Sequence, residues 1–437
     1  MGANRYSIQE QTPGRFRVRW YDDAGTRRSK TFGSRTEAKR FLNGVKADLD
    51  RGEYIDPADS RRTVREVGEL WLESRNLRPK TKQAYRTILD QRIYPTFGDR
   101  PIGGITTLDI VAWVTYLSTE GKRVGHNNKG DADPAKSRTA RDAKYRERKA
   151  ERDGETPKAG LAPGTVHNAA RVMNQVLGAA VRSRYLRGNP CDGLTREDLP
   201  RHRREEVAFL SAPQVARLAS AVEAVVDGIE GDRPEGYRTS DRAASFGRMV
   251  RFAAQTGLRA GEVCGLRWEN VDLLRGRVNV AESISTLSAD EFHVVPPKNG
   301  QSRWVSMTPD MTEELRAVFE ARGPQTADYL WPGNDGDDLP MHWGRDFYLR
   351  YWKRAAARAG LPDSLRFHDL RHTCAALLIA ANVPAKAIQV HLGHSSFKIT
   401  MDTYGHLYSD ATDLVSGAMA NAFAAPAEPS NVRQMWS

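Results

Sequence analysis

The spacing of the hydrophobic residues changes once along the chain, and this change constrains the fold more than any other feature. In "RFRVRW", residues 15–20, Phe16, Val18 and Trp20 alternate with arginines, which is the pattern of a half-buried strand. From Thr63 onward the apolar residues recur every three or four positions, which is the pattern of helices. A chain of 437 residues is also too long to form a single core. We therefore predict a multidomain α+β protein.

The first part, residues 1–57, is predicted to form a small β-sheet with one helix. After the alternating strand, "DDAG" supplies a turn and "RRSKTF" can return as a second strand. Ser34 and Glu37 have the spacing of a capping box, so we expect a helix to begin there and to run to about Leu49.

Three arginines, Arg15, Arg17 and Arg19, share the face of the strand opposite its apolar residues. The whole chain carries 66 Lys and Arg against 55 Asp and Glu, a formal charge of +11, which favours binding to a polyanion. These observations favour DNA binding by the arginine face. Exposed strand faces are also cationic for solubility and edge protection alone, so this alternative stays open.

Residues 63–190 are predicted to form an all-α domain. Thr63 and Glu66 form a second capping box at the start of its first helix. Three further helices are expected within "PKTKQAYRTILDQRIYPTFG", "TTLDIVAWVTYLST" and "APGTVHNAARVMNQVLGAAVRSRYL". Pro95 and Gly98 are expected to stop the first of these three.

Residues 121–160 interrupt this helical domain with a polar insertion. The segment holds 12 Lys and Arg and 7 Asp and Glu with almost nothing to bury, which indicates a basic loop or a frayed helical insertion. It could contact a DNA backbone or simply be solvated, and the residues favour neither alternative. Farther on, residues 195–206 are predicted to be a linker between domains.

Residues 207–424 are predicted to form a mainly α domain with a small antiparallel sheet, followed by a polar tail at 425–437. Within it, "GRMVRFAAQTGLRAGEVCGLRW" indicates two helices separated at Gly257. Strands are expected at "GRVNVAES", "EFHVVPP" and "SRWVSM". The Asn-Gly pair in "KNGQ" predicts a tight hairpin between the last two strands, with Lys298 at its tip.

Several classes of protein are disfavoured by the sequence. The 3 cysteines are far apart, so they provide neither a disulfide framework nor a paired metal site. The start, "MGANRYSIQE", lacks the apolar core of a secretory signal, and no apolar stretch is long enough to span a bilayer. We therefore expect a cytoplasmic protein without a membrane partner.

Histidines and arginines cluster in the third region. His368 and Arg371 in "HDLRHT" are three residues apart, so a helix would place them on one face. His391 and His394 in "VHLGHSS" have the same spacing, but this pair contains a glycine and lacks a nearby Cys or Glu, which disfavours zinc. No serine or cysteine occupies a nucleophile elbow. We therefore expect neither a metal nor a cofactor.

A phosphodiester substrate explains this cluster better. Arg371 and Arg259, in "TGLRAGEV", can neutralise the non-bridging phosphate oxygens. One histidine can hydrogen-bond the same oxygens, and a second can take a proton from an attacking hydroxyl. Lys298 can protonate the leaving oxygen. Tyr404, in "TMDTYGHL", is the candidate nucleophile, because nearby cations favour its phenolate form.

The segments "TGLRAGEVCGLRW", "HDLRHT", "LGHSS" and "TMDTYGHL", in this order, resemble the sequence boxes of the tyrosine recombinases, specifically the phage-type integrases. The resemblance implies that residues 207–424 form a tyrosine recombinase catalytic domain. It also implies that residues 63–190 form a helical, SAM-like core-binding domain. Residues 1–57 resemble the arm-type DNA-binding domain found on larger integrases.

The resemblance also implies roles for individual residues. Its expected catalytic residues are Arg259, Lys298, His368, Arg371, His394 and Tyr404. The two arginines would hold the scissile phosphate, the lysine would protonate the 5′-oxygen, and the first histidine would accept a proton or orient the phosphate. The tyrosine would be the nucleophile, with Tyr408 as a rival four residues on. Glu262 would buttress the site, and His372 would support it without touching the phosphate.

The activity that the resemblance implies is site-specific recombination of double-stranded DNA, independent of metal and ATP. The enzyme would form a 3′-phosphotyrosine and pass through a Holliday junction as a homotetramer. Its expected partners are core and arm attachment sites, together with an excision factor and a host DNA-bending protein. Integration and excision of a phage or mobile element at the nucleoid is the expected function.

Four alternatives stay open at this stage. A chromosomal Xer-like resolvase shares the chemistry but usually lacks a domain like residues 1–57. A type IB topoisomerase would use the same nucleophile without exchanging strands. A DNA-binding regulator would carry a vestigial site, which the complete residue set argues against. A histidine-metal phosphodiesterase would lose activity in EDTA.

Overall fold

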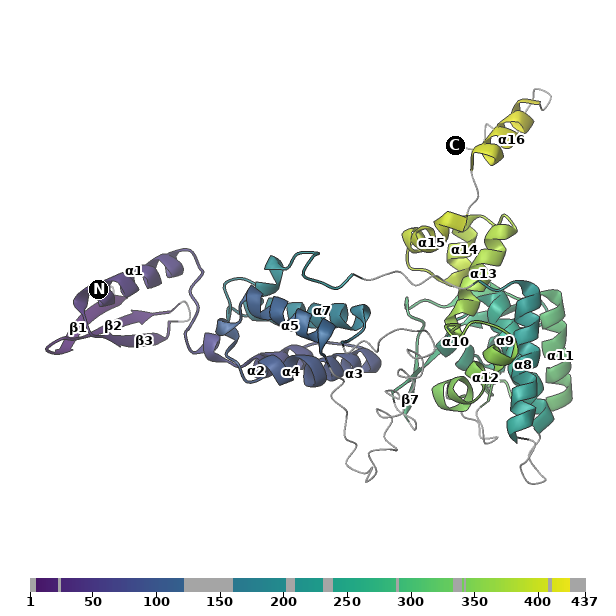
Figure 1. Cartoon of the computed structure of the whole chain (residues 1–437), viewed down its shortest axis with the longest axis horizontal. Helices are drawn as coiled ribbons and strands as arrows, with labels where there is room; N and C mark the ends of the chain where they lie inside the picture. The colour runs from purple at the N-terminus through teal and green to yellow at the C-terminus, as the bar shows by residue number, and fades with distance from the viewer. Residues whose placement is uncertain are drawn as a thin grey trace. The chain divides into compact units, whose positions relative to one another are not determined.

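In the computed structural model, drawn whole in Figure 1, the chain divides into two compact units, residues 1–204 and 205–437. The residues that it describes are 5–22, 25–121, 160–201, 209–230, 239–287, 291–332, 340–341, 343–407 and 411–424. The interior of the predicted insertion, the predicted tail and Tyr408 lie outside these residues. Within the described ranges, none of the helices has the length and hydropathy needed to cross a bilayer.

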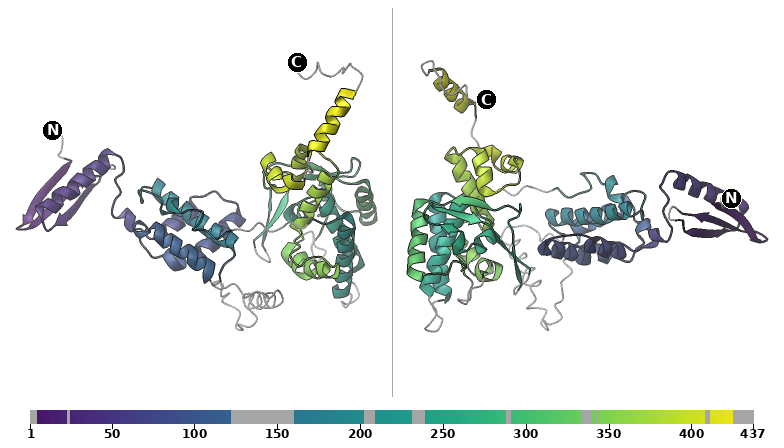
Figure 2. Two further views of the ribbon diagram at one scale, coloured as in Figure 1. Left: turned by 45° about the horizontal axis from the view of Figure 1, so that its top comes forward. Right: turned by 180° about the vertical axis from the view of Figure 1, so that it is seen from behind.

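The first unit begins with a three-stranded antiparallel sheet, one face of which packs against helix α1 (Figure 2). The elements are β1 (Tyr6–Thr12), β2 (Arg15–Tyr21), β3 (Arg27–Phe32) and α1 (Arg35–Asp50). Val18 and Trp20 of β2 share a buried cluster with Leu42 of α1. Ser34 caps the helix by accepting a hydrogen bond from the N–H of Glu37 at 3.2 Å. The predicted sheet and helix are confirmed, and β1 is an additional strand.

The rest of the first unit is helical. Its helices are α2 (Val64–Glu73), α3 (Pro79–Ile88), α4 (Tyr94–Phe97), α5 (Thr107–Thr119) and α7 (Pro163–Arg182). They enclose a buried cluster distinct from that of the sheet, with Trp113 and Met173 among its members. The predicted capping box is present, because Thr63 Oγ1 accepts from the N–H of Glu66 at 3.1 Å and the Glu66 carboxylate accepts in return at 2.8 Å.

The expectation that Pro95 stops a helix is wrong. The chain stays helical through this residue to Phe97, because residues Leu89–Ile93 widen into a π-helical turn just before the proline. In that turn the N–H of Tyr94 donates to the carbonyl of Leu89, five residues back. Proline has no N–H to donate and its ring needs space over the preceding turn, and the widened turn accommodates both.

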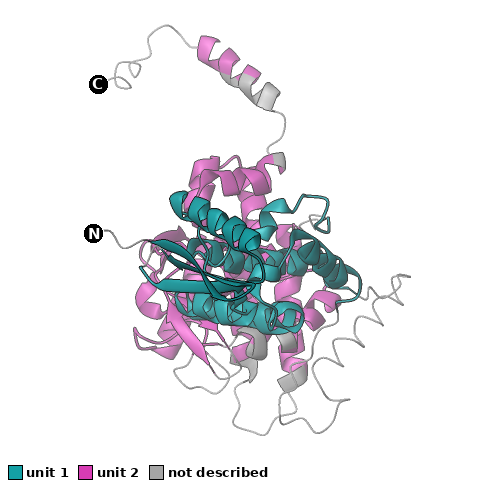
Figure 3. Cartoon of the chain, turned by 90° about the vertical axis from the view of Figure 1, so that its left-hand side faces the viewer, with its two compact units in different colours: residues 1–204 teal, residues 205–437 magenta. Residues whose placement is uncertain are grey.

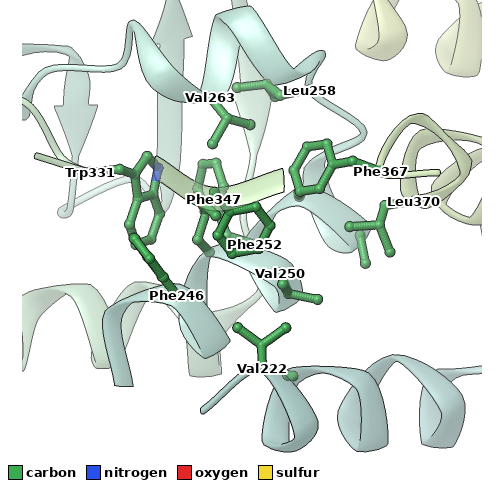
Figure 4. Close-up of a cluster of buried hydrophobic side chains, with 14 of the residues drawn as sticks. Val222, Phe246, Val250, Phe252, Leu258, Val263, Trp331, Phe347, Phe367 and Leu370 are labelled. Carbon is green, nitrogen blue, oxygen red and sulfur yellow. The ribbon is translucent and has the colours of Figure 1, made fainter. Parts of the chain in front are cut away.

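The second unit, magenta in Figure 3, is mainly helical around one large apolar cluster. Its helices are α8 (Ala212–Glu230), α9 (Thr239–Thr256), α10 (Ala260–Cys264), α11 (Pro309–Arg322), α12 (Lys353–Arg358), α13 (His368–Ala380), α14 (Ala385–Leu392), α15 (Phe397–Tyr404) and α16 (Ala411–Ala424). Figure 4 shows Phe252 and Phe347 in this cluster, with Phe367 and Leu370 from the start of α13. Burial of these two residues fixes the helix start that carries the "HDLRHT" side chains.

Two small antiparallel sheets lie in the second unit, in the orders β4-β5-β8 and β6-β7. Their strands are β4 (Val271–Asp272), β5 (Arg277–Val280), β6 (Ser283–Thr286), β7 (Phe292–Val295) and β8 (Arg303–Ser306). The small antiparallel sheet is confirmed, but the predicted hairpin between β7 and β8 is wrong, because β7 pairs with β6 and β8 pairs with β5. Lys298 lies in a turn that leads from one sheet to the other, with Gly300 at φ +76°. The Asn-Gly pair therefore forms a turn but closes no hairpin.

Candidate active site

A glycine separates α9 from α10 and places Arg259 in the site. Gly257 has φ +64°, and a Cβ there would lie 2.5 Å from Cδ2 of Leu392 on α14. Both constraints require glycine, so the chain can turn sharply and approach the end of α14 closely. Arg259 is the N-cap of α10, where its N–H donates to the Glu262 carboxylate at 3.0 Å.

Glu262 is buried at the centre of an arginine cluster. Its carboxylate accepts from Nη1 of Arg259 at 2.8 Å, and from Nη1 and Nη2 of Arg303 at 3.1 and 2.8 Å. Burial alone would raise the pKa of Glu262, but hydrogen bonds and charge from Arg303 and Arg259 outweigh it and lower the pKa to about 2. The carboxylate therefore stays ionised and holds both guanidinium groups in place.

Arg371 is buried and anchored by backbone carbonyl groups. Its Nη1 donates to the carbonyl of Gly257 at 2.8 Å, and its Nη2 donates to that of Leu392 at 2.6 Å. Nη2 of Arg259 donates to the carbonyl of Gly393, next to Leu392, at 3.4 Å. Burial and then the charge of Arg259 lower the pKa of Arg371 to about 9, so it stays protonated at neutral pH. The end of α14 thus gathers two cations side by side, an arrangement suited to a phosphate group.

Tyr404, the last residue of α15, lies beside these arginines with its side chain buried. Its Oη is 2.8 Å from Nδ1 of His372 on α13. The nearby cations Arg371 and Arg259 favour the phenolate, as expected, but they do not make it the dominant form. Burial outweighs the charges of Arg371 and Arg259 and raises the pKa of Tyr404 to about 12. The side chain is therefore a phenol at neutral pH.

The remaining histidines surround the tyrosine. The ring of His394 lies nearly parallel to that of Tyr404, with centroids 6.3 Å apart, and its Nδ1 is 2.9 Å from Oγ1 of Thr400. Burial, then Arg371 and Arg259, lower the pKa of His394 to about 3. His368 lies at the exposed edge of the cluster, where partial desolvation and then His372 and Arg371 lower its pKa. Both histidines are neutral at physiological pH until an anion enters.

The structure brings five of the six predicted catalytic residues together, and leaves one apart. The five are Arg259, Arg371, His368, His394 and Tyr404. Lys298 is exposed in the turn after β7. The predicted DNA-binding residues Arg15, Arg17 and Arg19 belong to β2 of the other unit.

Two features of the site escaped the sequence-based reasoning. Arg303 of β8 donates to Glu262 and, through Nε, to the carbonyl of His391 at 3.1 Å, yet nothing in its local sequence marks it. His372 touches the tyrosine directly, whereas it was expected only to support the site. Its position four residues after His368 on one helix was a signal that could have placed it beside the others.

Comparison with known proteins identifies the family. The profile of the phage integrase family matches residues 209–410, and that of the phage integrase N-terminal SAM-like domain matches residues 63–118. Together these matches span more than half of the chain. The chain belongs to the phage integrase family. The members of this family are tyrosine recombinases, so the chain is a site-specific recombinase, an enzyme that binds, cleaves and rejoins DNA.

Individual relatives agree with this family. The chain is 23% identical to the integrase of Mycobacterium phage D29 over 410 residues, covering 90% of this chain and 91% of that one. It is 27% identical to the ICEBs1 integrase of Bacillus subtilis over 263 residues, which cover 57% of this chain and 63% of that one. The Tn1549 transposon integrase bound to circular intermediate DNA superposes with a TM-score of 0.55 at 18% identity, covering 82% of this chain and 99% of that one. This last likeness concerns the fold alone.

Proposed function

We propose that this integrase inserts a phage or mobile element into DNA, and excises it, through a covalent bond between Tyr404 and a 3′-phosphate. The observation that carries the proposal is the position of the Tyr404 hydroxyl group beside two anchored arginines. Attack of Oη on the scissile phosphate releases a 5′-hydroxyl and leaves a 3′-phosphotyrosine. Attack of a partner strand's 5′-hydroxyl on that linkage reverses the step, so neither ATP nor a metal is needed.

In this proposal the two arginines neutralise the charge that develops on the phosphate. Two N–H groups of Arg371 donate to backbone carbonyl groups, and its other N–H groups are available to the non-bridging oxygens. Because Arg259 and Arg371 are held by carbonyl groups and by Glu262, they need no rearrangement when the phosphate arrives. His394 and His368 supply further hydrogen bonds to the same oxygens.

We propose that Lys298 protonates the leaving 5′-oxygen. It is an exposed residue in a turn, where a bound DNA strand could reach its ammonium group. A flexible four-carbon side chain suits a proton donor that must approach the phosphate only when DNA is present. DNA binding would therefore complete the set of six residues.

The three-stranded sheet is proposed to bind arm-type sites separate from the cleaved core sites. Arg17 of β2 lies between Gln9 of β1 and Thr31 of β3, and Arg19 lies between Ser7 and Ser29. This face therefore combines cations with short polar side chains, which suits contact with DNA. We propose domain limits of 1–57 for arm-site binding, 63–190 for core-site binding and 207–424 for catalysis. Binding to arm and core sites at once would raise the effective concentration of the enzyme at the core site.

Four copies of the chain are proposed to act together. The described residues of one chain contain one cluster of catalytic residues around Tyr404. Because exchange between two duplexes requires four strand cleavages, four chains would assemble on a Holliday junction. Simultaneous contact with arm and core sites requires the intervening DNA to bend. A host DNA-bending protein and an excision factor, acting at the nucleoid in the cytoplasm, are the proposed further partners.

The experiment that tests this function uses a nicked suicide duplex carrying the candidate core site, in EDTA. Wild type should form a covalent protein–DNA band, and Tyr404→Phe should form none while still binding the duplex. A band that persists in Tyr404→Phe would assign the nucleophile to Tyr408 or another residue. Loss of the wild-type band in EDTA would point to the metal-dependent alternative.

A further inference from the structure

We propose that His372 is the base that takes the proton of Tyr404 during cleavage and returns it during rejoining. This inference rests on the proposed function, since it concerns the same nucleophile. The resemblance implies that His368 accepts a proton or orients the phosphate, and that His372 only supports the site.

The geometry points to His372 because it contacts the nucleophilic atom. Nδ1 of His372 is 2.8 Å from Oη of Tyr404, and the two rings meet edge to face with centroids 5.6 Å apart. Among the described residues, no other hydrogen-bond partner of this hydroxyl is found. His372 follows Arg371 directly on α13, so one helix turn presents both a phosphate-binding cation and the proton acceptor.

The buried tyrosine needs a base. Because burial raises its pKa to about 12, only about one molecule in 10⁵ would carry a phenolate at neutral pH. Oη must therefore lose its proton as it attacks. Burial lowers the pKa of His372, and Arg366 and Arg371 add to this effect while Asp369 opposes it. The imidazole is thus neutral at physiological pH and can accept a proton at Nδ1.

The other histidines are less suitable acceptors. Nδ1 of His394 is already bonded to Thr400, and this histidine makes no hydrogen bond to Tyr404. The rings of His368 and His372 meet edge to face with centroids 5.0 Å apart, and His368 lies at the exposed side of the cluster. Both are therefore better placed to contact the phosphate oxygens than the tyrosine proton.

In the proposed cleavage, Tyr404 gives its proton to His372, and the 5′-oxygen receives one from Lys298. As the Oη–P bond forms, the Oη–H bond breaks and its proton moves to Nδ1 of His372. The P–O5′ bond breaks, and its electron pair stays on O5′, which takes a proton from Lys298. In rejoining, the 5′-hydroxyl attacks phosphorus while its O5′–H bond breaks and the proton returns to the neutral Lys298 amine. The Oη–P bond breaks, and Oη recovers the proton from Nδ1. The transient imidazolium lies near the carboxylate of Asp369, which favours it.

The variant His372→Asn distinguishes a residue that accepts the proton of Tyr404 from one that only positions its hydroxyl. The Asn Oδ1 can accept the hydrogen bond of Tyr404 but cannot take its proton at neutral pH. Using the full chain and the nicked suicide duplex, we expect the rate of covalent-complex formation to fall about 10²- to 10⁴-fold with DNA binding unchanged. The matched control is His391→Asn. His391 lies on α14 and contacts Cys374 rather than Tyr404, so its replacement should reduce the cleavage rate far less.

The pH profile is the second readout. The wild-type rate should level off once His372 is deprotonated, whereas the His372→Asn rate should keep rising about tenfold per pH unit as hydroxide forms the phenolate. The titratable and charged groups around His372 in the described residues are His368, Asp369, Arg366, Arg371, His394 and Tyr404. All of them are present in both proteins, so the difference between the profiles reports on residue 372.

A duplex with a 5′-bridging phosphorothiolate supplies the third readout, because its sulfur leaving group needs no proton. It should restore cleavage by Lys298→Ala but not by His372→Asn. Wild-type rate and profile in a folded His372→Asn chain, or its rescue by sulfur, would overturn the assignment. Absence of Tyr404-dependent cleavage in wild type would instead overturn the proposed function, and the assignment with it.

Discussion

Arginines are used differently in the two units. Arg15, Arg17 and Arg19 stand on one face of β2, opposite the buried side of the sheet, and are exposed or half-buried. In the second unit, Arg371 is 2% exposed and the side chain of Arg303 is 8% exposed. The first group faces solvent, where salt screens its charge, whereas the second group is buried and its charge is screened much less.

This difference shows what burial of a cation requires. Backbone carbonyls and the Glu262 carboxylate accept hydrogen bonds from the buried donors of Arg371 and Arg303. The same partners fix their geometry, which is what stabilisation of a transition state needs. The arginines of β2 lack such anchors and suit affinity rather than catalysis.

The largest expected effect comes from changing a buried cation. Arg371→Lys keeps the charge but loses the planar set of donors, so cleavage of the suicide duplex should fall about 10²- to 10³-fold, with DNA affinity nearly unchanged. Arg354→Lys, at an exposed position of α12, is the matched control and should cleave normally. An unchanged cleavage rate in Arg371→Lys would contradict the phosphate-binding role.

The next effect concerns Glu262. Its pKa is lowered from 4.5 to about 2 in the folded state, so its contribution to stability is present above about pH 5 and is lost as pH falls toward 2. This shift corresponds to about 3 kcal/mol. In denaturation of the full chain, Glu262→Gln should be less stable than wild type at about pH 6. At low pH the difference in unfolding free energy between the two proteins should shrink by about 3 kcal/mol.

The control for this measurement is Glu313→Gln. Glu313 pairs with Arg316 at the surface, with its side chain 74% exposed, so its removal should leave the stability nearly unchanged at either pH. A gap between Glu262→Gln and wild type that stayed constant with pH would contradict an ionised, arginine-held carboxylate.

The exposed arginines of β2 should affect DNA binding rather than cleavage, the opposite of what is expected for Arg371. Replacing Arg15, Arg17 and Arg19 with Gln should weaken binding to arm-type DNA by about one to two orders of magnitude, and make its salt dependence shallower by about 3 charges. Cleavage of a core-site duplex should be spared. The control replaces three exposed cations of α1, on the other side of the sheet, namely Arg35, Lys39 and Arg40. Equal loss of arm binding and core cleavage would refute the division of roles.

The smallest expected effect tests the interior of the first unit, where a neutral hydrogen bond joins Trp20 and Tyr54. Nε1 of Trp20 donates to the Tyr54 hydroxyl at 2.9 Å. Tyr54→Phe leaves this buried N–H unpaired and should cost about 1 to 2 kcal/mol of unfolding free energy. Tyr21→Phe, on the arginine face, should cost less. Equal losses of unfolding free energy in the two variants would show that the hydrogen bond between Trp20 and the Tyr54 hydroxyl does not stabilise the fold.

Features that depend on near neighbours in the chain were predictable. Ser34 and Thr63 cap the helices that they were expected to cap, because a cap needs only a side-chain oxygen and the N–H three residues on. Gly257 interrupts two helices as expected, because a positive φ is a property of one residue. His368 and Arg371 lie together because one helix turn joins them.

Features that depend on distant residues were not predictable in the same way. The pairing of β7 with β6 rather than β8 was decided by which strands the core could bring together. Pro95 was accommodated because a widened turn precedes it within a packed helical core. Arg303 reaches Glu262 across 41 positions of sequence, which no local pattern records.

The sequence by itself therefore determined the family, the helix starts and the residues available for phosphate chemistry, since short-range hydrogen bonds and motif order specify them. Tertiary structure decided the protonation states and the contacts. Tyr404 is a phenol because α13, α14 and α15 bury it, and its proton faces His372 because α13 and α15 meet there. Desolvation and pairing arise only when distant segments pack together, so they cannot be read from one segment.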